Sequence, residues 1–347
     1  MNQAHPGERR DRPTMHDVAA LAGVGIKTVS RVFNDVPTVA PDLVTRVRSA
    51  AEKLGYRPNL TAASLRRSGG RTNTIGLLLE DVSNPFSSLV HRAVEDYARS
   101  RNILVLAGSL DEDHNREREL TRTLIDRRVD GIIVMPSGSD HRYIVAEQQA
   151  GVSFVFIDRP PSPLLADLVV SDHHGGARRA VRHLLDGGRR AVAYLGDDLG
   201  VYTAQQRFAG YCDALTEAGI DREPALVRHG LRTAGQARDA AWEILTSAAP
   251  DAIFSSQNLI TIGVLEALHR LNLHRTVALV GFDDVPLADV VDPGVTVMAQ
   301  DPTAIGTEAT RLLFARMDGD TSPPAVYTIP THLIVRGSGE LPVLAAP

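Results

Sequence analysis

The stretch "AGVGIKTVSRVFN", residues 22–34, reads as a turn followed by a short amphipathic helix. Its apolar side chains recur at helical spacing and predict a buried face made of Val29, Val32 and Phe33. Its polar side chains predict an outward face made of Lys27, Ser30 and Arg31. Gly25 stands at the start of this helix, where a capping Ser, Thr, Asp or Asn is usual. The stretch therefore predicts a helix with one packed side and one side available to a partner.

Helix signals flank this stretch on both sides. Thr14 and Asp17 have the spacing of a capping box, which predicts a helix that ends at the turn residue Gly23. Pro41 and Asp42 open a third helix, whose apolar residues recur at helical spacing until Gly55. Helix, tight turn with Gly, and helix, followed by a third short helix, predict a helix-turn-helix headpiece between residues 14 and 58.

The charge of the chain is unevenly distributed. The net charge is −5 overall, but residues 1–71 hold 12 Lys and Arg against 6 Asp and Glu. The rest of the chain holds 25 against 36 and is acidic. A basic head on an acidic body indicates that the small module binds a polyanion and the larger part does not.

Length and composition predict a cytoplasmic protein of two or three packed domains. The chain has 347 residues with 43% hydrophobic content, enough for more than one core. Residues 1–13 are polar and charged, so we expect a disordered extension there and neither a signal peptide nor a membrane anchor. One cysteine, Cys212, rules out a disulfide framework within the chain and is expected to be a buried small hydrophobe.

Residues 58–71, "PNLTAASLRRSGGR", have the composition of a linker that is at most weakly helical alone. Beyond Thr72, short apolar runs alternate with helical segments, which predicts parallel sheets covered on both faces. The runs expected to form buried parallel strands are 75–79, 103–107, 131–135, 154–157, 191–195, 252–254, 277–281 and 333–335. The expected helices include 89–99, 116–127, 176–185, 208–218 and 263–271.

The motifs "DVAALAGVGIKTVSRVFN", "VRSAAEKLGYRPN", "AASL", "DVSNPF", "VDGIIVMP", "RFAGY" and "LVGFDD" occur in an order that resembles the LacI-type bacterial transcription regulators. The resemblance extends from Thr14 to Arg336. It implies an N-terminal all-α helix-turn-helix headpiece joined to an α/β, two-lobed regulatory domain like that of periplasmic binding proteins. It also implies a homodimer that binds a near-palindromic operator, and a small effector between the lobes.

The domain limits expected from this resemblance divide the chain into four parts. Residues 1–13 form the extension, 14–58 the headpiece, and 59–71 a hinge helix and linker. Residues 72–347 form the effector-binding and dimerisation domain, with a first lobe at about 72–170 and 300–332 and a second at about 171–299 and 333–347. The segment 337–347 holds no leucine heptad, which favours a dimer over a tetramer.

By their places in the motif, three residues are expected to meet base edges in the major groove: Ile26, Lys27 and Arg31. A merely solvated helix face is the alternative. Residues placed for phosphate contacts, which orient the headpiece without reading sequence, are Thr14, Thr28, Ser30, Asn34 and Asn59. In the hinge motif "AASL", Ala62 and Leu65 are expected at the minor groove, with Leu65 as a wedge that kinks the duplex. Packing of Leu65 against the body is the alternative.

Three positions depart from the family pattern. Gly25 and Ala40 replace serines that would cap a helix and reach a phosphate, and Ala63 stands where many members have Arg. Gly in place of Ser costs only a few tenths of a kcal/mol as a cap, whereas Ala costs about 1 kcal/mol. We therefore expect weaker phosphate anchoring with the headpiece fold retained.

The resemblance transfers a set of polar residues and one aromatic to the interlobe cleft. The residues expected to contact the effector are Asp81, Phe86, Asp158, Arg207, Asn258, Asp283 and Gln300. Convergent charged groups with one aromatic describe a site for a small hydroxylated molecule, such as a sugar or sugar derivative. Capping or interlobe hydrogen bonds are the alternative for each residue taken singly. Asn258 replaces an Asp of many relatives, so the cleft accepts an acidic ligand slightly more easily.

The sequence favours a ligand-responsive repressor over two rival classes. An enzyme is disfavoured because the body carries no dinucleotide, P-loop, zinc-protease or nucleophile-elbow motif. We expect no cofactor and no metal, because adjacent His173 and His174 do not face one site, and 111–113 reads as a solvated helix start. The remaining alternative is a cytoplasmic solute-binding protein or non-catalytic sensor of the same fold without operator-specific repression. Induction and corepression both stay open.

Overall fold

The computed structural model describes residues 13–34, 36–57, 71–138 and 140–343. It falls into two compact units that divide between Asn73 and Thr74. The predicted hinge residues Asn59, Ala62 and Leu65 lie outside the described residues, as does nearly all of the expected extension. In the described part, no helix is long and apolar enough to cross a membrane.

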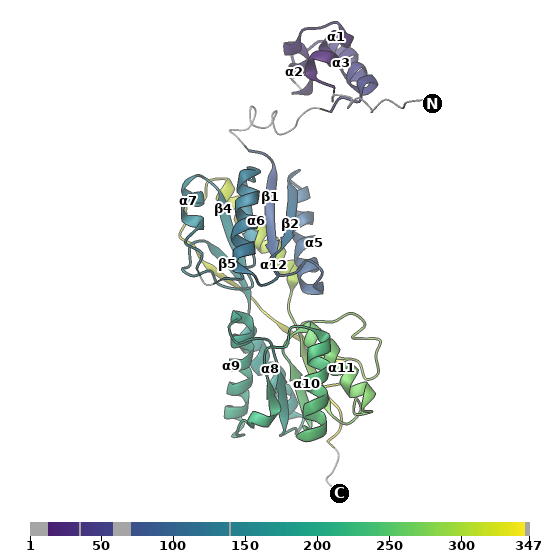
Figure 1. Cartoon of the computed structure of the whole chain (residues 1–347), viewed down its shortest axis with the longest axis vertical. Helices are drawn as coiled ribbons and strands as arrows, with labels where there is room; N and C mark the ends of the chain where they lie inside the picture. Colours follow the sequence, from purple (N-terminus) through teal and green to yellow (C-terminus); the bar gives the residue numbers. More distant parts are fainter. Residues whose placement is uncertain (1–12, 35, 58–70, 139, 344–347) are drawn as a thin grey trace, which may run out of the picture. The chain divides into compact units, whose positions relative to one another are not determined.

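The first unit is the predicted three-helix headpiece, formed by α1 (Met15–Ala22), α2 (Ile26–Phe33) and α3 (Pro41–Leu54) (Figure 1). The capping box of α1 is present, and Gly23 ends that helix in the left-handed conformation with φ 61°. One fully buried valine from each helix meets at the centre: Val18, Val29 and Val47. The helix positions expected from the sequence are therefore confirmed.

The second unit contains two six-stranded sheets. The first sheet is wholly parallel, in the order β11 (Val326–Ile329), β5 (Asp167–Ser171), β4 (Ser153–Ile157), β3 (Gly131–Val134), β1 (Thr74–Leu79) and β2 (Leu104–Ser109). The second runs β12 (His332–Ile334), β10 (Thr296–Ala299), β9 (Ala278–Phe282), β8 (Ala252–Ser255), β6 (Val192–Leu195) and β7 (Val227–Arg228). Among the strands of the described residues, β12 alone is antiparallel to its neighbour.

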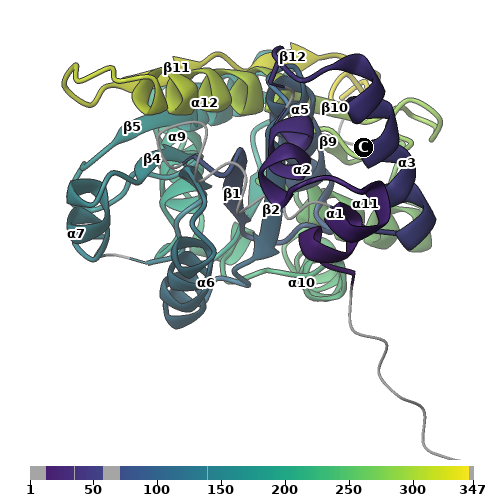
Figure 2. The same ribbon diagram turned by 90° about the horizontal axis from the view of Figure 1, so that it is seen from above.

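Helices cover both faces of each sheet, as parallel sheets require. On the first sheet, α5 (Pro85–Arg99) and α12 (Pro302–Met317) lie on one face, and α6 (His114–Asp126) and α7 (Ile144–Gln149) on the other (Figure 2). The second sheet is packed between the pair α8 (His173–Asp186) and α9 (Tyr202–Glu217) and the pair α10 (Ala234–Ser247) and α11 (Asn258–Arg270). A short 3-10 helix, η1 (Pro224–Leu226), precedes β7. The predicted fold class is confirmed.

The chain passes between the two sheets three times. The three connections follow β5, β10 and β11, so α12 and β11 return to the first lobe after most of the second lobe is complete. Residues after the carboxyl ends of the strands are therefore brought together from distant parts of the chain. The exact limits predicted for each lobe stay predictions.

The expected strand at 333–335 is partly wrong. It forms β12, which is antiparallel and lies at the sheet edge, with Leu333 36% and Val335 56% exposed. A short apolar run does not reveal whether it is central or at an edge, because both kinds of strand use the same residues. Elements that the sequence analysis did not propose are β5, β7, β10, β11, α7, α10 and α12.

Candidate functional site

The two faces of α2 are as expected from the sequence. Val29 is fully buried and Val32 is 2% exposed, whereas Lys27 and Arg31 are exposed. Ile26 is 37% exposed although it is a large apolar residue at a helix start. Since Ile26, Lys27 and Arg31 are exposed on a helix whose other face is packed, the outward face of α2 is a candidate contact surface.

Three of the remaining headpiece candidates, Thr14, Ser30 and Asn34, make local side-chain hydrogen bonds. The Thr14 hydroxyl donates to Asp17 Oδ2 at 2.7 Å, and Asn34 Nδ2 donates to Ser30 Oγ at 3.3 Å. Thr28 and Ser30 are half-buried, and Thr14 is exposed. Their part in binding stays a prediction.

The two helix starts that depart from the family pattern lack a side-chain cap, as expected. Gly25 and Ala40 are the N-caps of α2 and α3, and neither helix start has a side-chain cap. A Cβ built on Gly25 meets nothing within 4 Å, and its φ of −71° suits any L-residue. A serine side chain therefore fits at Gly25 without strain.

Arg46 is a structural residue of the headpiece that sequence reasoning missed. Its Nη2 donates to the carbonyl oxygens of Ala22 and Gly23 at 2.6 and 3.3 Å. These carbonyls lie at the end of α1, where intrahelical donors run out. Arg46 thus fixes the turn that sets α2 against α1, a contact invisible in the local sequence pattern.

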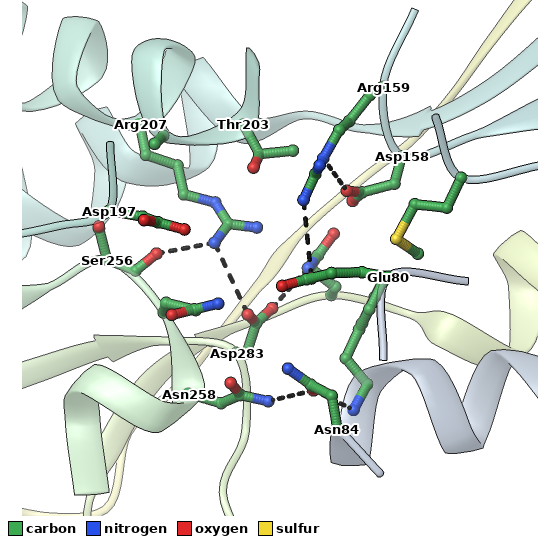
Figure 3. A pocket seen from close by; sticks show the side chains of 15 residues that line it. Glu80, Asn84, Asp158, Arg159, Asp197, Thr203, Arg207, Ser256, Asn258 and Asp283 are labelled. Atoms are coloured by element: carbon green, nitrogen blue, oxygen red, sulfur yellow. Dashed lines mark hydrogen bonds and ion pairs between the residues drawn. The ribbon is translucent and has the colours of Figure 1, made fainter. Parts of the chain in front are cut away.

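A polar cavity lies between the loops that follow the strands of the two sheets (Figure 3). Six of the seven predicted effector residues line it: Phe86, Asp158, Arg207, Asn258, Asp283 and Gln300. Asp81 is not among its lining residues, because its carboxylate accepts from the backbone N–H and the hydroxyl of Ser83, both at 2.8 Å. Glu80, one position earlier, lines the cavity instead.

Several lining residues were missed, among them Glu80, Asn84, Arg159, Asp197, Thr203 and Gln257. Glu80 directly follows β1, and Asp158 with Arg159 follows β4. The general rule that ligands bind beyond the carboxyl ends of parallel strands would have identified these positions. Asp158 and Asp283 follow β4 and β9 with φ of 66° and 70°, a conformation that aspartate tolerates better than most residues.

On the second lobe, Arg207 of α9 is the centre of a buried polar cluster. Its Nη1 donates to the carbonyl of Ser256 at 2.7 Å and lies 3.7 Å from Asp283 Oδ2. The guanidinium stacks on Phe282, with its carbon 4.1 Å from the ring centroid. Burial raises the pKa of Asp283, although Arg207 opposes the shift.

His173 joins this cluster as a neutral side chain. Its Nδ1 accepts from Arg207, 3.4 Å from Nε, so the ring proton lies on Nε2. Burial, with Arg207 adding to it, holds the pKa of His173 well below its usual value. Nε2 lies 3.6 Å from Asp158 Oδ1 of the first lobe and has no hydrogen-bond partner.

On the first lobe, Arg159 is shared by three carboxylates. It lies 2.7 Å from Glu112, 3.4 Å from Asp158 and 3.6 Å from Glu80. The prediction of a solvated helix start at 111–113 is therefore wrong for Glu112, whose side chain is only 11% exposed. An acidic run appears solvated in the sequence because its basic partner is 47 residues away.

One direct hydrogen bond links the lobes across the cavity. Asn258 Nδ2, at the start of α11, donates to Asn84 Oδ1 at 2.8 Å. The same oxygen accepts from the Phe86 backbone N–H at 3.0 Å, as the cap of α5. Asn84 Oδ1 is an acceptor in both hydrogen bonds. An ionised Asp at position 258 would have no proton to donate to it.

The arrangement of headpiece and cleft agrees with the comparisons with known proteins. Residues 14–59 match the family model described as "Bacterial regulatory proteins, lacI family", and residues 181–339 match "Periplasmic binding protein-like domain". The HTH-type transcriptional regulator CelR of Thermobifida fusca is 32% identical over 345 residues, 96% of this chain and 100% of that protein. This chain belongs to the LacI-type family of bacterial transcriptional regulators.

Other LacI-type proteins agree over nearly the whole length. The ribose operon repressor of Halalkalibacterium halodurans is 31% identical over 93% of this chain and 96% of that protein. A structure of a CelR–cellobiose complex has 30% identity and a TM-score of 0.68, covering 94% and 100% of the two chains. The lac repressor dimer bound to operator and an anti-inducer has a TM-score of 0.82 at 24% identity, covering 95% and 99%, and shares the fold.

The LacI-type relatives are transcriptional regulators rather than enzymes, and this chain is a transcriptional regulator as they are.

The two adjacent histidines have separate surroundings. His173 is buried beside Arg207, whereas His174 is half-buried and lies 2.8 Å from Asp213. Among the described residues, no three His, Cys, Asp or Glu side chains are grouped to hold a metal ion. Cys212 is half-buried rather than buried.

Proposed function

We propose that this LacI-type regulator is a repressor that binds a near-palindromic operator as a homodimer and responds to a small hydroxylated, sugar-like effector in its cleft. The observation that carries the proposal is the outward face of α2. Ile26, Lys27 and Arg31 are exposed on a helix whose other face is packed, in the geometry of a recognition helix. The predominantly acidic body is unsuited to bind DNA itself.

The proposed DNA contacts divide into base reading and positioning. Lys27 and Arg31 donate to guanine acceptors in the major groove, and Ile26 packs on a thymine methyl group. Phosphates accept from Thr14, Thr28, Ser30, Asn34 and Asn59. Ala62 and Leu65 approach the minor groove in the hinge, where Leu65 unstacks a base step.

The proposed effector site is supported by polar atoms without a protein partner. Two cavity-lining residues, Gln257 and Gln300, have a buried Oε1 acceptor without a hydrogen bond. Buried polar atoms are normally paired, so these two atoms are available to a ligand that donates. Half-buried Phe86 supplies the apolar surface for a sugar-like ring. We do not assign Asp81 to this site.

The proposed control works through the angle between the lobes. An effector that binds one arrangement more tightly shifts the population toward it, and a dimer passes that shift to its two hinge helices. Coupling of about 1–3 kcal/mol is typical of such systems. The domain limits given from the sequence, a cytoplasmic location and the dimer are part of this proposal.

The test is genome-wide mapping of the sites bound by the full chain, followed by measurement of affinity for the recovered site and for random DNA. We expect a near-palindromic site whose affinity falls in Lys27→Ala, while Lys53→Ala, an exposed lysine of α3, serves as control. The absence of specific sites would favour the alternative, a solute-binding protein without operator-specific repression. An equal loss on random DNA would refute base reading by Lys27.

A further inference from the structure

We propose that the ligand of this cleft carries a positively charged nitrogen in addition to its hydroxyl groups, held between Glu80 of the first lobe and Asp197 of the second. The proposal rests on the proposed function, because it specifies the chemistry of the effector.

The cavity has more carboxylates than bases. Four carboxylates line it, from Glu80, Asp158, Asp197 and Asp283, against two guanidinium groups, from Arg159 and Arg207. A third acid of the first lobe, Glu112, lies 2.7 Å from Arg159. Buried charges need partners of the opposite sign, so this excess of acid is costly unless a ligand compensates for it.

Glu80 competes with two other carboxylates for its basic partner, Arg159. Its Oε2 lies 3.6 Å from Arg159 Nη2, whereas Glu112 contacts the same guanidinium at 2.7 Å. Asp158 lies at 3.4 Å and also competes for it. Because the Glu80 side chain is 24% exposed, water compensates for only part of its charge.

Asp197 has an equally weak partner. It is 8% exposed and follows β6 on the second lobe. Its ion-pair partner is Arg232, at 3.5 Å, whose side chain is 51% exposed. Ion pairs with such exposed partners contribute little, so the hydrogen bond from the Asp198 backbone N–H at 2.7 Å is its main compensation.

Glu80 and Asp197 line the same cavity from different lobes, and both carboxylates are poorly compensated. Burial raises the pKa of both carboxyls, and the charge of Asp197 adds to the shift at Glu80. An ammonium group between them would reverse this repulsion, because it attracts both carboxylates. Since the two acids belong to different lobes, such a ligand stabilises the arrangement in which they are close.

The uncharged groups of the cavity point to the same ligand chemistry. Gln257 Oε1 and Gln300 Oε1 are buried acceptors that lack a donor. Arg207 already donates to Ser256, and Arg159 already donates to Glu112. The site therefore favours a ligand rich in donors, and an ammonium group adds N–H donors to those that the hydroxyl groups of a polyol already supply.

The experiment measures binding of matched sugars to the full chain by calorimetry and thermal shift, in a buffer without amines. The probes are glucose, galactose and mannose, each with its 2-amino and its uronate form. We expect at least one amino sugar to bind about tenfold or more tightly than its neutral parent, because hydrogen bonds to charged groups are stronger. We expect no uronate to bind more tightly than its parent.

Variants test where the preference originates. Glu80→Gln and Asp197→Asn should each remove most of the preference for the amine, while Asp81→Asn, a neighbouring acid outside the cavity lining, should keep it. Equal or tighter binding of the neutral parents, a preference that survives both variants, or no binding by any amine would each overturn the proposal. The repressor proposal is judged separately by the mapping of bound sites, which requires no ligand.

Discussion

The headpiece and the cleft place their polar residues in opposite surroundings. On α2, Lys27 and Arg31 are exposed, over a core that Val29 and Val32 complete without them. In the cleft, Arg207 is 5% exposed and Asp283 is 6% exposed, and each depends on the other. Exposed charges cost little on folding, whereas buried charges are tied to the free energy of unfolding. Substitutions of the exposed side chains of α2 should therefore change binding alone, and substitutions in the cleft should change binding and stability together.

The largest expected effect is at Arg207. Arg207→Ala leaves Asp283 buried without its base and removes the hydrogen bond to Ser256, so we expect a loss of about 3–5 kcal/mol in the free energy of unfolding of the body. Chemical denaturation followed by circular dichroism measures it. Arg232→Ala, which removes a half-exposed base, is the control and should cost less than about 1 kcal/mol. A similar small loss in both variants would remove the contrast between cleft and surface.

The second effect depends on pH. Burial raises the pKa of Glu80 to about 7 from a usual value of 4.5, so its contribution to stability is full below pH 4.5 and is lost as the pH rises to 7. Glu80→Gln should therefore gain stability over the wild type by up to about 3 kcal/mol at pH 8, and much less at pH 5. Thermal denaturation at the two pH values measures the difference. A gain independent of pH would show that ionisation of Glu80 is not its cause.

The third effect concerns the exposed side chains of α2. Lys27→Ala or Arg31→Ala should weaken operator binding by about 1–3 kcal/mol and relax the preference at one base pair in each half-site. The melting temperature of the protein should not change, because both side chains are exposed. Binding to a set of single-base operator variants measures the preference. A loss of stability in either variant would show that the replaced side chain also stabilises the headpiece fold.

The smallest effects are at the two uncapped helix starts. Ala40→Ser should raise headpiece stability by about 1 kcal/mol, and Gly25→Ser by only a few tenths. Gly25→Ser should also tighten binding to operator and random DNA alike, because a phosphate contact reads no sequence. Tighter binding to the operator alone would mean that the serine reads bases.

Prediction from sequence succeeded where the signals are local. The capping box at Thr14, the left-handed Gly23 and the helical spacing of α2 each depend on a few neighbouring residues. Long apolar runs such as β1 and β3 are buried on both faces and were also found. Burial was predicted less well, because the expected buried runs at 103–107 and 333–335 form the edge strands β2 and β12, whereas the buried strands β5 and β10 were missed.

The sequence predicted cleft residues only where a motif of the family includes them. Six of the seven residues expected from the resemblance line the cavity, whereas Asp81 does not and its neighbour Glu80 does. Adjacent residues after a strand point in different directions, and only the folded loop decides which one enters the cavity. The pairing of Glu112 with Arg159 was hidden for the same reason, since no local pattern records a partner 47 residues away.

The sequence by itself determined the headpiece, the alternation of strands and helices in the body and the family, because helix caps, turns and hydrophobic periodicity act over a few residues. Only the tertiary structure decided which acids share Arg159, that Asn84 meets Asn258, and that Glu80 and Asp197 lack adequate bases. These are properties of side chains that three crossings of the chain bring together. Their energies depend on burial and distance, which exist only after folding.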